Sequence, residues 1–200
     1  MARGTFAAMA RWSVLPTLLL FVLGPWTEVQ AFYIQLHGQV TDYFSGDGLK
    51  DMQVRLVKDS IDRETVVTGR NGEYELILER GYEYLVWFSG QGRVTKHVRI
   101  DTREVPPIPD VPFYDMDLQM TMFLWIDGVD FSILEKPVAE AHYRHSIRNL
   151  TWDTEHTERV RRELSRVMAH YEHAFHKHKG VKGTSSGSGT SRRKRKRVDF

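Results

Sequence analysis

Residues 68–88 alternate between apolar and polar side chains, and this alternation limits the fold more than any other feature of the chain. The apolar positions of its two runs are Tyr74, Leu76 and Leu78, followed by Tyr84, Val86 and Phe88. Successive side chains of a strand point to opposite faces, so each run predicts a strand with one apolar face. Turn dipeptides, Asn71-Gly72 and Arg80-Gly81, precede the two runs. The segment therefore predicts a hairpin of two consecutive antiparallel strands whose apolar side must be covered.

Four further segments alternate in the same way, at residues 33–42, 52–56, 94–100 and 113–123, and residues 64–68 form a shorter piece rich in β-branched side chains that also predicts a strand. Turn clusters separate the strands at intervals of about ten residues. Seven short strands with this spacing predict a mainly β chain, with a seven-stranded Greek-key β-sandwich over residues 32–125. An up-and-down barrel is the alternative. Residues 126–152 predict an extended excursion that packs on the sandwich.

A C-terminal amphipathic α-helix is predicted over residues 153–179, with Asp153 as its N-cap and Gly180 as its end. Its apolar residues fall at helical spacing and form one stripe: Val160, Leu164, Val167, Met168, Tyr171 and Phe175. An apolar stripe must dock on something. Its own sandwich is one candidate, and a partner protein that packs against this helix face is the other.

The first 31 residues have the order of a secretory signal peptide. Arg3 and Arg11 precede a short apolar run, and a small-residue cleavage site ends at Ala31. The run is too short to cross a bilayer of about 30 Å comfortably, which favours cleavage over an anchor helix. We therefore expect an exported protein of the periplasm or cell envelope without a membrane span. The chain contains no cysteine, so its stability must come from the core alone.

The net charge of +2 combines a mildly acidic body with a strongly basic end. Residues 180–200 predict a Gly/Ser linker and a disordered polybasic tail. The basic residues of the tail are Arg192, Arg193, Lys194, Arg195, Lys196 and Arg197. Outside the cytoplasm such a cluster binds anionic lipid or lipopolysaccharide, or it serves only as a solubilising tail. Export argues against a specific nucleic-acid partner.

Three histidines of the predicted helix, His170, His173 and His176, are spaced three residues apart along one side. They lie on the arc opposite Leu164 and Tyr171 and are expected to be exposed. Neutral imidazoles placed in this way bind Zn²⁺, Ni²⁺ or Cu²⁺ weakly. A solvated face that happens to be rich in histidine is the alternative, because no carboxylate or cysteine completes a closed site.

Catalysis has little support in the sequence, and no catalytic residue is predicted. The chain has no His-Glu-x-x-His, no Gly-x-Ser-x-Gly, no phosphate-binding loop and no cysteine nucleophile. No cofactor is predicted either. These observations favour a binding or structural module over an enzyme.

The chain resembles carboxypeptidase-regulatory-like domains of Bacteroidota-type cell envelopes. The resemblance rests on the GQVTD run from Gly38, the Gly48-to-Val54 entry to the second strand, and the GRNGEYEL run from Gly69. The run from Ile126 to Tyr143 is similar to an extension seen beside such domains. Where the family often has Gly-Tyr before the sixth strand, this chain has Gly90-Gln91-Gly92-Arg93, so the local turn differs.

The resemblance implies a transthyretin-like sandwich and a non-catalytic interaction or scaffold module at the envelope. It implies another envelope protein as the partner and does not supply a ligand. Two alternatives follow from the residues themselves. The first is a weak metal-binding periplasmic protein that uses the histidines of the helix, and the second is a binder of anionic envelope surfaces that uses the basic tail.

Overall fold

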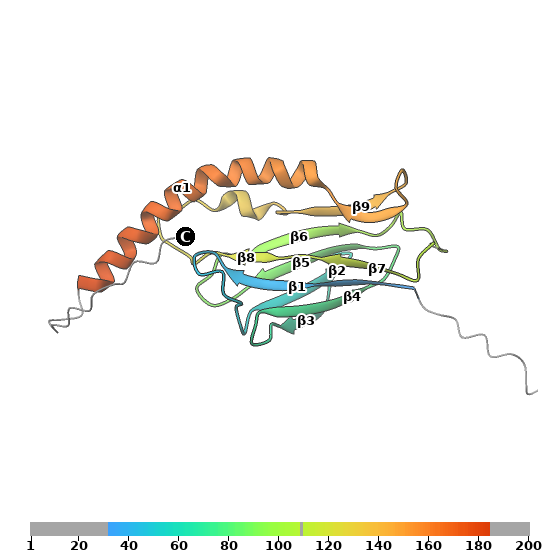
Figure 1. Cartoon of the computed structure of the whole chain (residues 1–200), viewed down its shortest axis with the longest axis horizontal. Helices are drawn as coiled ribbons and strands as arrows, with labels where there is room; N and C mark the ends of the chain where they lie inside the picture. Colours follow the sequence, from blue (N-terminus) through green and yellow to red (C-terminus); the bar gives the residue numbers. More distant parts are fainter. Residues whose placement is uncertain (1–31, 109, 185–200) are drawn as a thin grey trace, which may run out of the picture. The chain divides into compact units, whose positions relative to one another are not determined.

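The computed structural model describes residues 32–108 and 110–184. These residues form ten strands, one short 3-10 helix and one α-helix (Figure 1). In chain order the elements are β1 (Tyr33–Asp42), β2 (Gln53–Lys58), β3 (Ile61–Val67), β4 (Glu73–Leu78), β5 (Glu83–Ser89), β6 (Lys96–Asp101), β7 (Phe113–Asp117), β8 (Met120–Met122), η1 (Ser132–Glu135), β9 (Glu140–Arg144), β10 (Asn149–Trp152) and α1 (Thr154–Thr184). The described chain is therefore mainly β with one C-terminal helix, as predicted.

The strands form two mixed sheets. The first has the order β4-β1-β7, and β8 also pairs with β1. The second has the order β10-β9-β6-β5-β2-β3. β1 runs parallel to β7 and β8, and β6 runs parallel to β9, while the other pairs are antiparallel.

One apolar core lies between the two sheets. The first sheet contributes buried residues from β1, β4 and β7, and the second contributes buried residues from β2, β5, β6, β9 and β10. The rings of Tyr74 on β4 and Phe88 on β5 meet edge to face, with centroids 5.3 Å apart. For most strands the alternation in the sequence correctly predicted which side is buried, because the face of a strand that packs on the core must leave water. β3 is the exception, since none of its residues is buried.

The predicted hairpin of residues 68–88 is wrong in its pairing. β4 pairs with β1 in the first sheet, whereas β5 pairs with β2 and β6 in the second. The connection between β4 and β5 crosses from one sheet to the other. The Tyr84 hydroxyl holds this crossing, since it accepts the Glu79 N–H at 3.0 Å and donates to the Glu79 carbonyl at 3.3 Å. The two apolar faces therefore cover each other across the core.

The predicted strand 113–123 is divided into β7 and β8 at Leu118 and Gln119. Both pieces keep the same register along β1, so the alternation of apolar residues continues through the break. The break lies against Gly38, where a Cβ atom would lie 2.0 Å from the Leu118 carbonyl oxygen. Only glycine permits this approach, and the Leu118 carbonyl accepts the Tyr74 hydroxyl at 2.9 Å.

The predicted count of seven strands is also too low for the described residues. The division of residues 113–123 adds one strand, and the predicted excursion 126–152 contains β9 and β10. β9 extends the second sheet beyond β6 (Figure 1). Ala141, Tyr143 and Leu150 are buried in the same core as the earlier strands. A boundary at residue 125 therefore does not separate two structural parts.

The helix α1 begins where the sequence predicted. The Asp153 carboxylate accepts the N–H groups of Glu155 at 2.9 Å and His156 at 3.0 Å, which is the geometry of an N-cap. The helix continues past Gly180 to Thr184, so the predicted end at this glycine is wrong. Glycine costs about 1 kcal/mol in a helix but keeps its backbone hydrogen bonds. None of the described helices is long and apolar enough to cross a membrane.

Candidate functional site

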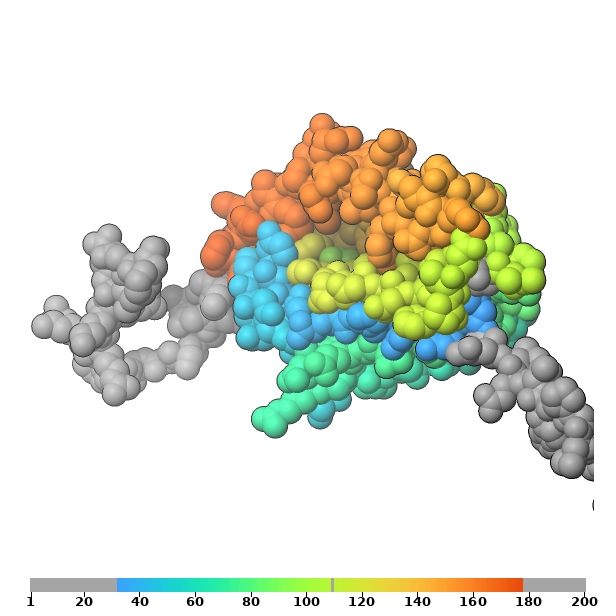
Figure 2. Space-filling view, turned by 45° about the vertical axis from the view of Figure 1, so that its right-hand side comes forward, coloured from blue at the N-terminus to red at the C-terminus, as the bar shows by residue number. Residues whose placement is uncertain are grey.

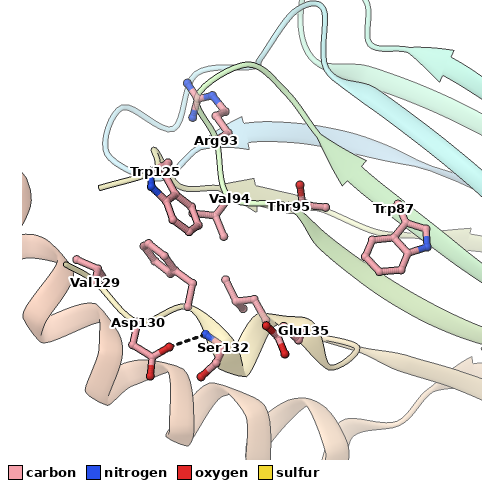
Figure 3. A pocket seen from close by; sticks show the side chains of 11 residues that line it. Trp87, Arg93, Val94, Thr95, Trp125, Val129, Asp130, Ser132 and Glu135 are labelled. Carbon is pink, nitrogen blue, oxygen red and sulfur yellow. Dashed lines mark hydrogen bonds between the residues drawn. The ribbon is translucent and has the colours of Figure 1, made fainter. Parts of the chain in front are cut away.

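A pocket of about 510 Å³, here called the aromatic pocket, opens on the outer face of the second sheet (Figure 3). Trp87 projects from that face because its neighbours Val86 and Phe88 on β5 point into the core. Figure 3 shows Trp87 at one end of the pocket and Trp125 at the other. The complete lining is Trp87, Arg93, Val94, Thr95, Trp125, Val129, Asp130, Phe131, Ser132, Leu134 and Glu135.

Backbone hydrogen bonds hold Trp125 over the turn between β5 and β6. The Trp125 N–H donates to the Gly92 carbonyl at 2.8 Å, and the Val94 N–H donates to the Phe123 carbonyl at 3.0 Å. The Trp125 indole N–H donates to the Asp127 carboxylate at 3.2 Å. Trp125 is nevertheless 58% exposed. The chain therefore fixes a large aromatic ring at the surface instead of burying it.

The opposite wall of the pocket is η1 and the residues before it. The Asp130 carboxylate accepts the Ser132 N–H at 2.9 Å (Figure 3). This hydrogen bond lowers the pKa of the Asp130 carboxyl, so it is ionised at neutral pH. Phe131 is buried beneath this wall, with its ring centroid 5.7 Å from that of Trp125. The wall thus joins an apolar floor to a charged rim.

Trp87 is stacked between two cross-strand neighbours. The His97 ring lies 4.1 Å from it at an interplanar angle of 20°, and the Arg55 guanidinium carbon lies 5.7 Å from its centroid. His97 is buried, which lowers its pKa and keeps the imidazole neutral at neutral pH. Its Nδ1 has no hydrogen-bond partner among the described residues. This stack holds the Trp87 ring in one orientation.

A largely buried ion pair anchors Arg93 at the edge of the pocket. Its Nη1 lies 2.8 Å from Asp42 Oδ2, and the two side chains are 14% and 18% exposed. Asp42 also accepts the N–H groups of Phe44 and Ser45. Burial alone would raise the pKa of Asp42, but the hydrogen bonds from Arg93 and from these N–H groups outweigh it and lower the pKa.

Asp42→Ala should lower the free energy of unfolding by about 2 kcal/mol at pH 7, because it removes hydrogen bonds to a charged group and leaves Arg93 without its carboxylate. The folded pKa of Asp42 lies below its ordinary value of 3.8. The stabilisation is therefore present above that pH and is lost as the pH falls through the lowered pKa. Urea unfolding at pH 7 and at pH 3 measures both effects. An equal loss at the two pH values would contradict the assignment to an ionised carboxylate.

The three predicted histidine ligands lie on exposed positions of α1. His176 packs against aromatic rings, with centroids 6.0 Å from Phe175 and 6.5 Å from Phe44. Within the described ranges, no group of three or more histidine, cysteine, aspartate or glutamate side chains is placed to hold a metal ion. Weak metal binding by His170, His173 and His176 stays a prediction.

The predicted partner face of the helix is covered by the protein's own body. Met168 and Tyr171 are buried in a second apolar cluster with Phe123, Phe131 and other residues that precede the helix, and Leu164, Val167 and Phe175 pack against this cluster. Val160 is buried as well. Of the two candidates for covering the apolar stripe, the protein's own body and a partner protein, the structure therefore shows the protein's own body.

Two further predictions lie outside the described residues. They are the signal peptide at residues 1–31 and the basic cluster from Arg192 to Arg197. Sequence reasoning also missed the aromatic pocket. One signal was available, because Trp87 occupies the face of its strand opposite Tyr84, Val86 and Phe88. A large apolar residue on the predicted polar face indicates either a covering element or a binding surface.

Comparisons with known proteins give distant likenesses. No family model matches the chain, and no curated protein matches its sequence. Among solved structures, a 3-chlorocatechol 1,2-dioxygenase from Rhodococcus opacus is similar at 12% identity with a TM-score of 0.37. The likeness covers 48% of this chain and 60% of the dioxygenase.

Two other similar structures come from Bacteroides fragilis and Parabacteroides merdae. A protein from Bacteroides fragilis, described as membrane-associated and of unknown function, is 12% identical over 46% of this chain and 28% of its own, with a TM-score of 0.34. A protein of the DUF3823 family from Parabacteroides merdae is 18% identical over 48% of both chains, also with a TM-score of 0.34. The chain spans less than two thirds of each of these three structures. TM-scores this low do not indicate a function.

Proposed function

We propose that this protein is an exported, non-catalytic interaction module of the bacterial cell envelope, and that it binds a partner protein through the aromatic pocket. The observation that carries the proposal is the exposed ring of Trp125 at a pocket whose floor is Phe131 and whose far end is Trp87. Tryptophan and arginine in concave, partly buried positions dominate the binding energy of protein interfaces. A partner side chain inserted here would contact Trp125 and the charged rim together.

The chemistry of the lining supports binding over catalysis. No histidine, lysine or cysteine is among the described residues that line the aromatic pocket. The bases that this lining offers near Ser132 are the carboxylates of Asp130 and Glu135, and the lowered pKa of Asp130 makes it a weak base for activating a hydroxyl. The carboxylates of Asp130 and Glu135 lie at the rim, where they favour a partner segment that carries a positive charge.

The sequence supports the envelope location and the finer fold assignment. The N-terminal segment has the order of a signal peptide, and the motifs from Gly38 to Leu76 resemble carboxypeptidase-regulatory-like domains. We include the transthyretin-like Greek-key classification in the proposal on this resemblance. The two sheets around a shared core are compatible with it.

Trp125→Ala should reduce recovery of the partner at least tenfold, because truncation of a central interface tryptophan costs about 2 kcal/mol or more. The measurement is quantitative co-purification from the native cell envelope with wild-type and variant protein. A photo-crosslinking amino acid at position 125 should capture the same partner. Since Trp125 is more than half exposed, the variant should keep the stability of the wild type.

Ile61→Ala is the matched control. Ile61 on β3 is also 58% exposed but does not line the aromatic pocket. This control should recover the partner as well as the wild type, and a crosslinker at position 61 should not capture it. Equal recovery by the wild type and the Trp125 variant would contradict the proposal.

A further inference from the structure

A second pocket, here called the lysine groove, lies between α1 and the segment that contains β8. Its volume is about 360 Å³. Figure 2 shows a hollow between the orange residues of the C-terminal part and the yellow residues near position 120. Most of its lining is apolar and includes Met120, Phe123, Val160 and Leu164. A cavity of this size and composition is within the usual range for small-molecule sites.

The groove contains an unusual buried cation, Lys96 at the start of β6. The residue is only 4% exposed. Its amine donates a hydrogen bond to the Thr121 carbonyl and lies 3.6 Å from the centre of the Phe123 ring. An ammonium group has three donors, and Lys96 forms no ion pair with any described residue. Burial lowers its pKa to about 7.

Lys58 provides an internal comparison, because it is the other buried lysine of the described residues. Lys58 is 8% exposed and also lies over an aromatic ring, that of Tyr82, at 3.3 Å. Its amine is 2.6 Å from the Glu79 carboxylate, and this hydrogen bond raises its pKa. Buried charges are normally paired in this way. Lys96 is likewise less than a tenth exposed and lies over an aromatic ring, but no described residue supplies a carboxylate to it.

The other polar groups that line the groove do not supply a negative charge for Lys96. Arg161 of α1 adds a second positive charge at the rim, where it pairs with Glu158 at 2.7 Å. Tyr43, at the end of β1, donates its hydroxyl to Glu172 at 2.8 Å. Gln119, Thr121 and Thr157 are neutral. No aspartate or glutamate is among the described residues that line the groove.

We propose that the lysine groove binds a small amphipathic carboxylate of the fatty-acid class, with its carboxylate on Lys96 and its apolar body against Phe123, Val160 and Leu164. One buried cation matches a monoanion, whereas a dianionic phosphate would leave buried charge unpaired. The site is separate from the aromatic pocket and does not depend on the function proposed for it. Its ligand supplies the counter-charge that Glu79 supplies to Lys58.

Binding of such a ligand takes up a proton at mildly alkaline pH. In the free protein at pH 8 the Lys96 amine is largely neutral, because its pKa is about 7. A bound carboxylate favours the charged form and raises this pKa. The amine therefore takes a proton from the buffer as the ion pair forms, and the ligand remains unchanged.

The test is isothermal titration of the purified protein with octanoate at pH 8, in two buffers that differ in ionisation heat. We expect saturable binding at one site with uptake of close to one proton. Lys96→Met should weaken octanoate binding at least tenfold, while Lys58→Met and Trp125→Ala should leave it within twofold of the wild type. Arg161→Gln should weaken it about threefold, and Arg162→Gln, on the same helix but outside the groove, should not.

Absence of octanoate binding at millimolar concentrations would overturn the proposal, as would equal affinity of the Lys96→Met variant and the wild type. Binding without proton uptake at pH 8 would overturn it as well, since Lys96 would then not be the partner of the carboxylate. The Arg161 and Arg162 variants change exposed residues and should fold normally. Their difference in octanoate affinity therefore tests the location of the site even if the lysine variants fold poorly. The octanoate test is independent of the partner-capture test: a Trp125→Ala variant that no longer captures the partner should still bind octanoate.

Discussion

Tyr171→Ala should lower the free energy of unfolding by about 4 kcal/mol, within the range measured when large buried aromatic side chains are truncated. Tyr171 is 0% exposed and joins α1 to the rest of the domain. Its ring centroid lies within 6 Å of those of Phe44, Phe123 and Phe131. Its hydroxyl accepts the Leu124 N–H at 3.0 Å, next to the aromatic pocket. The alanine variant loses these contacts and leaves a cavity under the helix.

Urea unfolding followed by circular dichroism measures this loss. Tyr171→Phe should cost only about 1 kcal/mol, because it keeps the ring and removes one hydrogen-bond acceptor. His170→Ala is the control on the exposed neighbouring position, and its effect should remain within about 0.5 kcal/mol. A loss below about 1 kcal/mol for the alanine variant would mean that α1 does not depend on Tyr171 for docking.

Lys96→Met should raise the free energy of unfolding by about 1–4 kcal/mol at pH 6, in the absence of ligand, because it replaces an unpaired buried charge by an apolar side chain of similar length. The gain should depend on pH. The pKa of Lys96 is about 7 in the folded protein, against an ordinary value of 10.5. Between these values the unfolded chain binds more protons than the folded one, so the wild type becomes more stable as the pH rises.

The difference between variant and wild type should therefore shrink from pH 7 to pH 10. Denaturant midpoints at pH 6, 8 and 10 measure it. Lys58→Met is the control, and it should show no such pH-dependent gain because Glu79 already pairs with that lysine. A constant difference across this pH range would show that Lys96 titrates normally in the folded protein.

The two lysines also show why the candidate sites were hard to predict from sequence. Lys58 and Lys96 occupy similar places at strand ends, and the acidic neighbour of Lys58 in the sequence, Asp59, is not its ion-pair partner. Glu79 lies 21 positions from Lys58, and the residues around Lys96 come from β8, the following segment and α1. Pairing and burial are properties of contacts that are distant in sequence.

The same holds for the aromatic pocket. The sequence shows Trp87, Arg93 and Trp125 but not that they line one pocket. They come together because residues 123–125 form backbone hydrogen bonds with the turn after β5. The face of the predicted helix is the opposite case. Its stripe was predicted correctly as apolar, while the sequence left open whether the protein or a partner covers it. The contacts of Tyr171 with Phe123 and Phe131 decide this in favour of the protein itself.

By itself, the sequence determined the local properties: which segments are extended, which face of most strands is buried, and where the C-terminal helix begins. These follow from side-chain alternation, turn residues and the Asp153 cap, all of which act over a few residues. Only the tertiary structure decided that β4 and β5 belong to different sheets and that β9 and β10 complete the second sheet. It also decided that Lys96 is buried with no carboxylate partner among residues 32–108 and 110–184. An apolar face must be covered, but many partners satisfy that requirement, and the choice depends on the packing of the whole core.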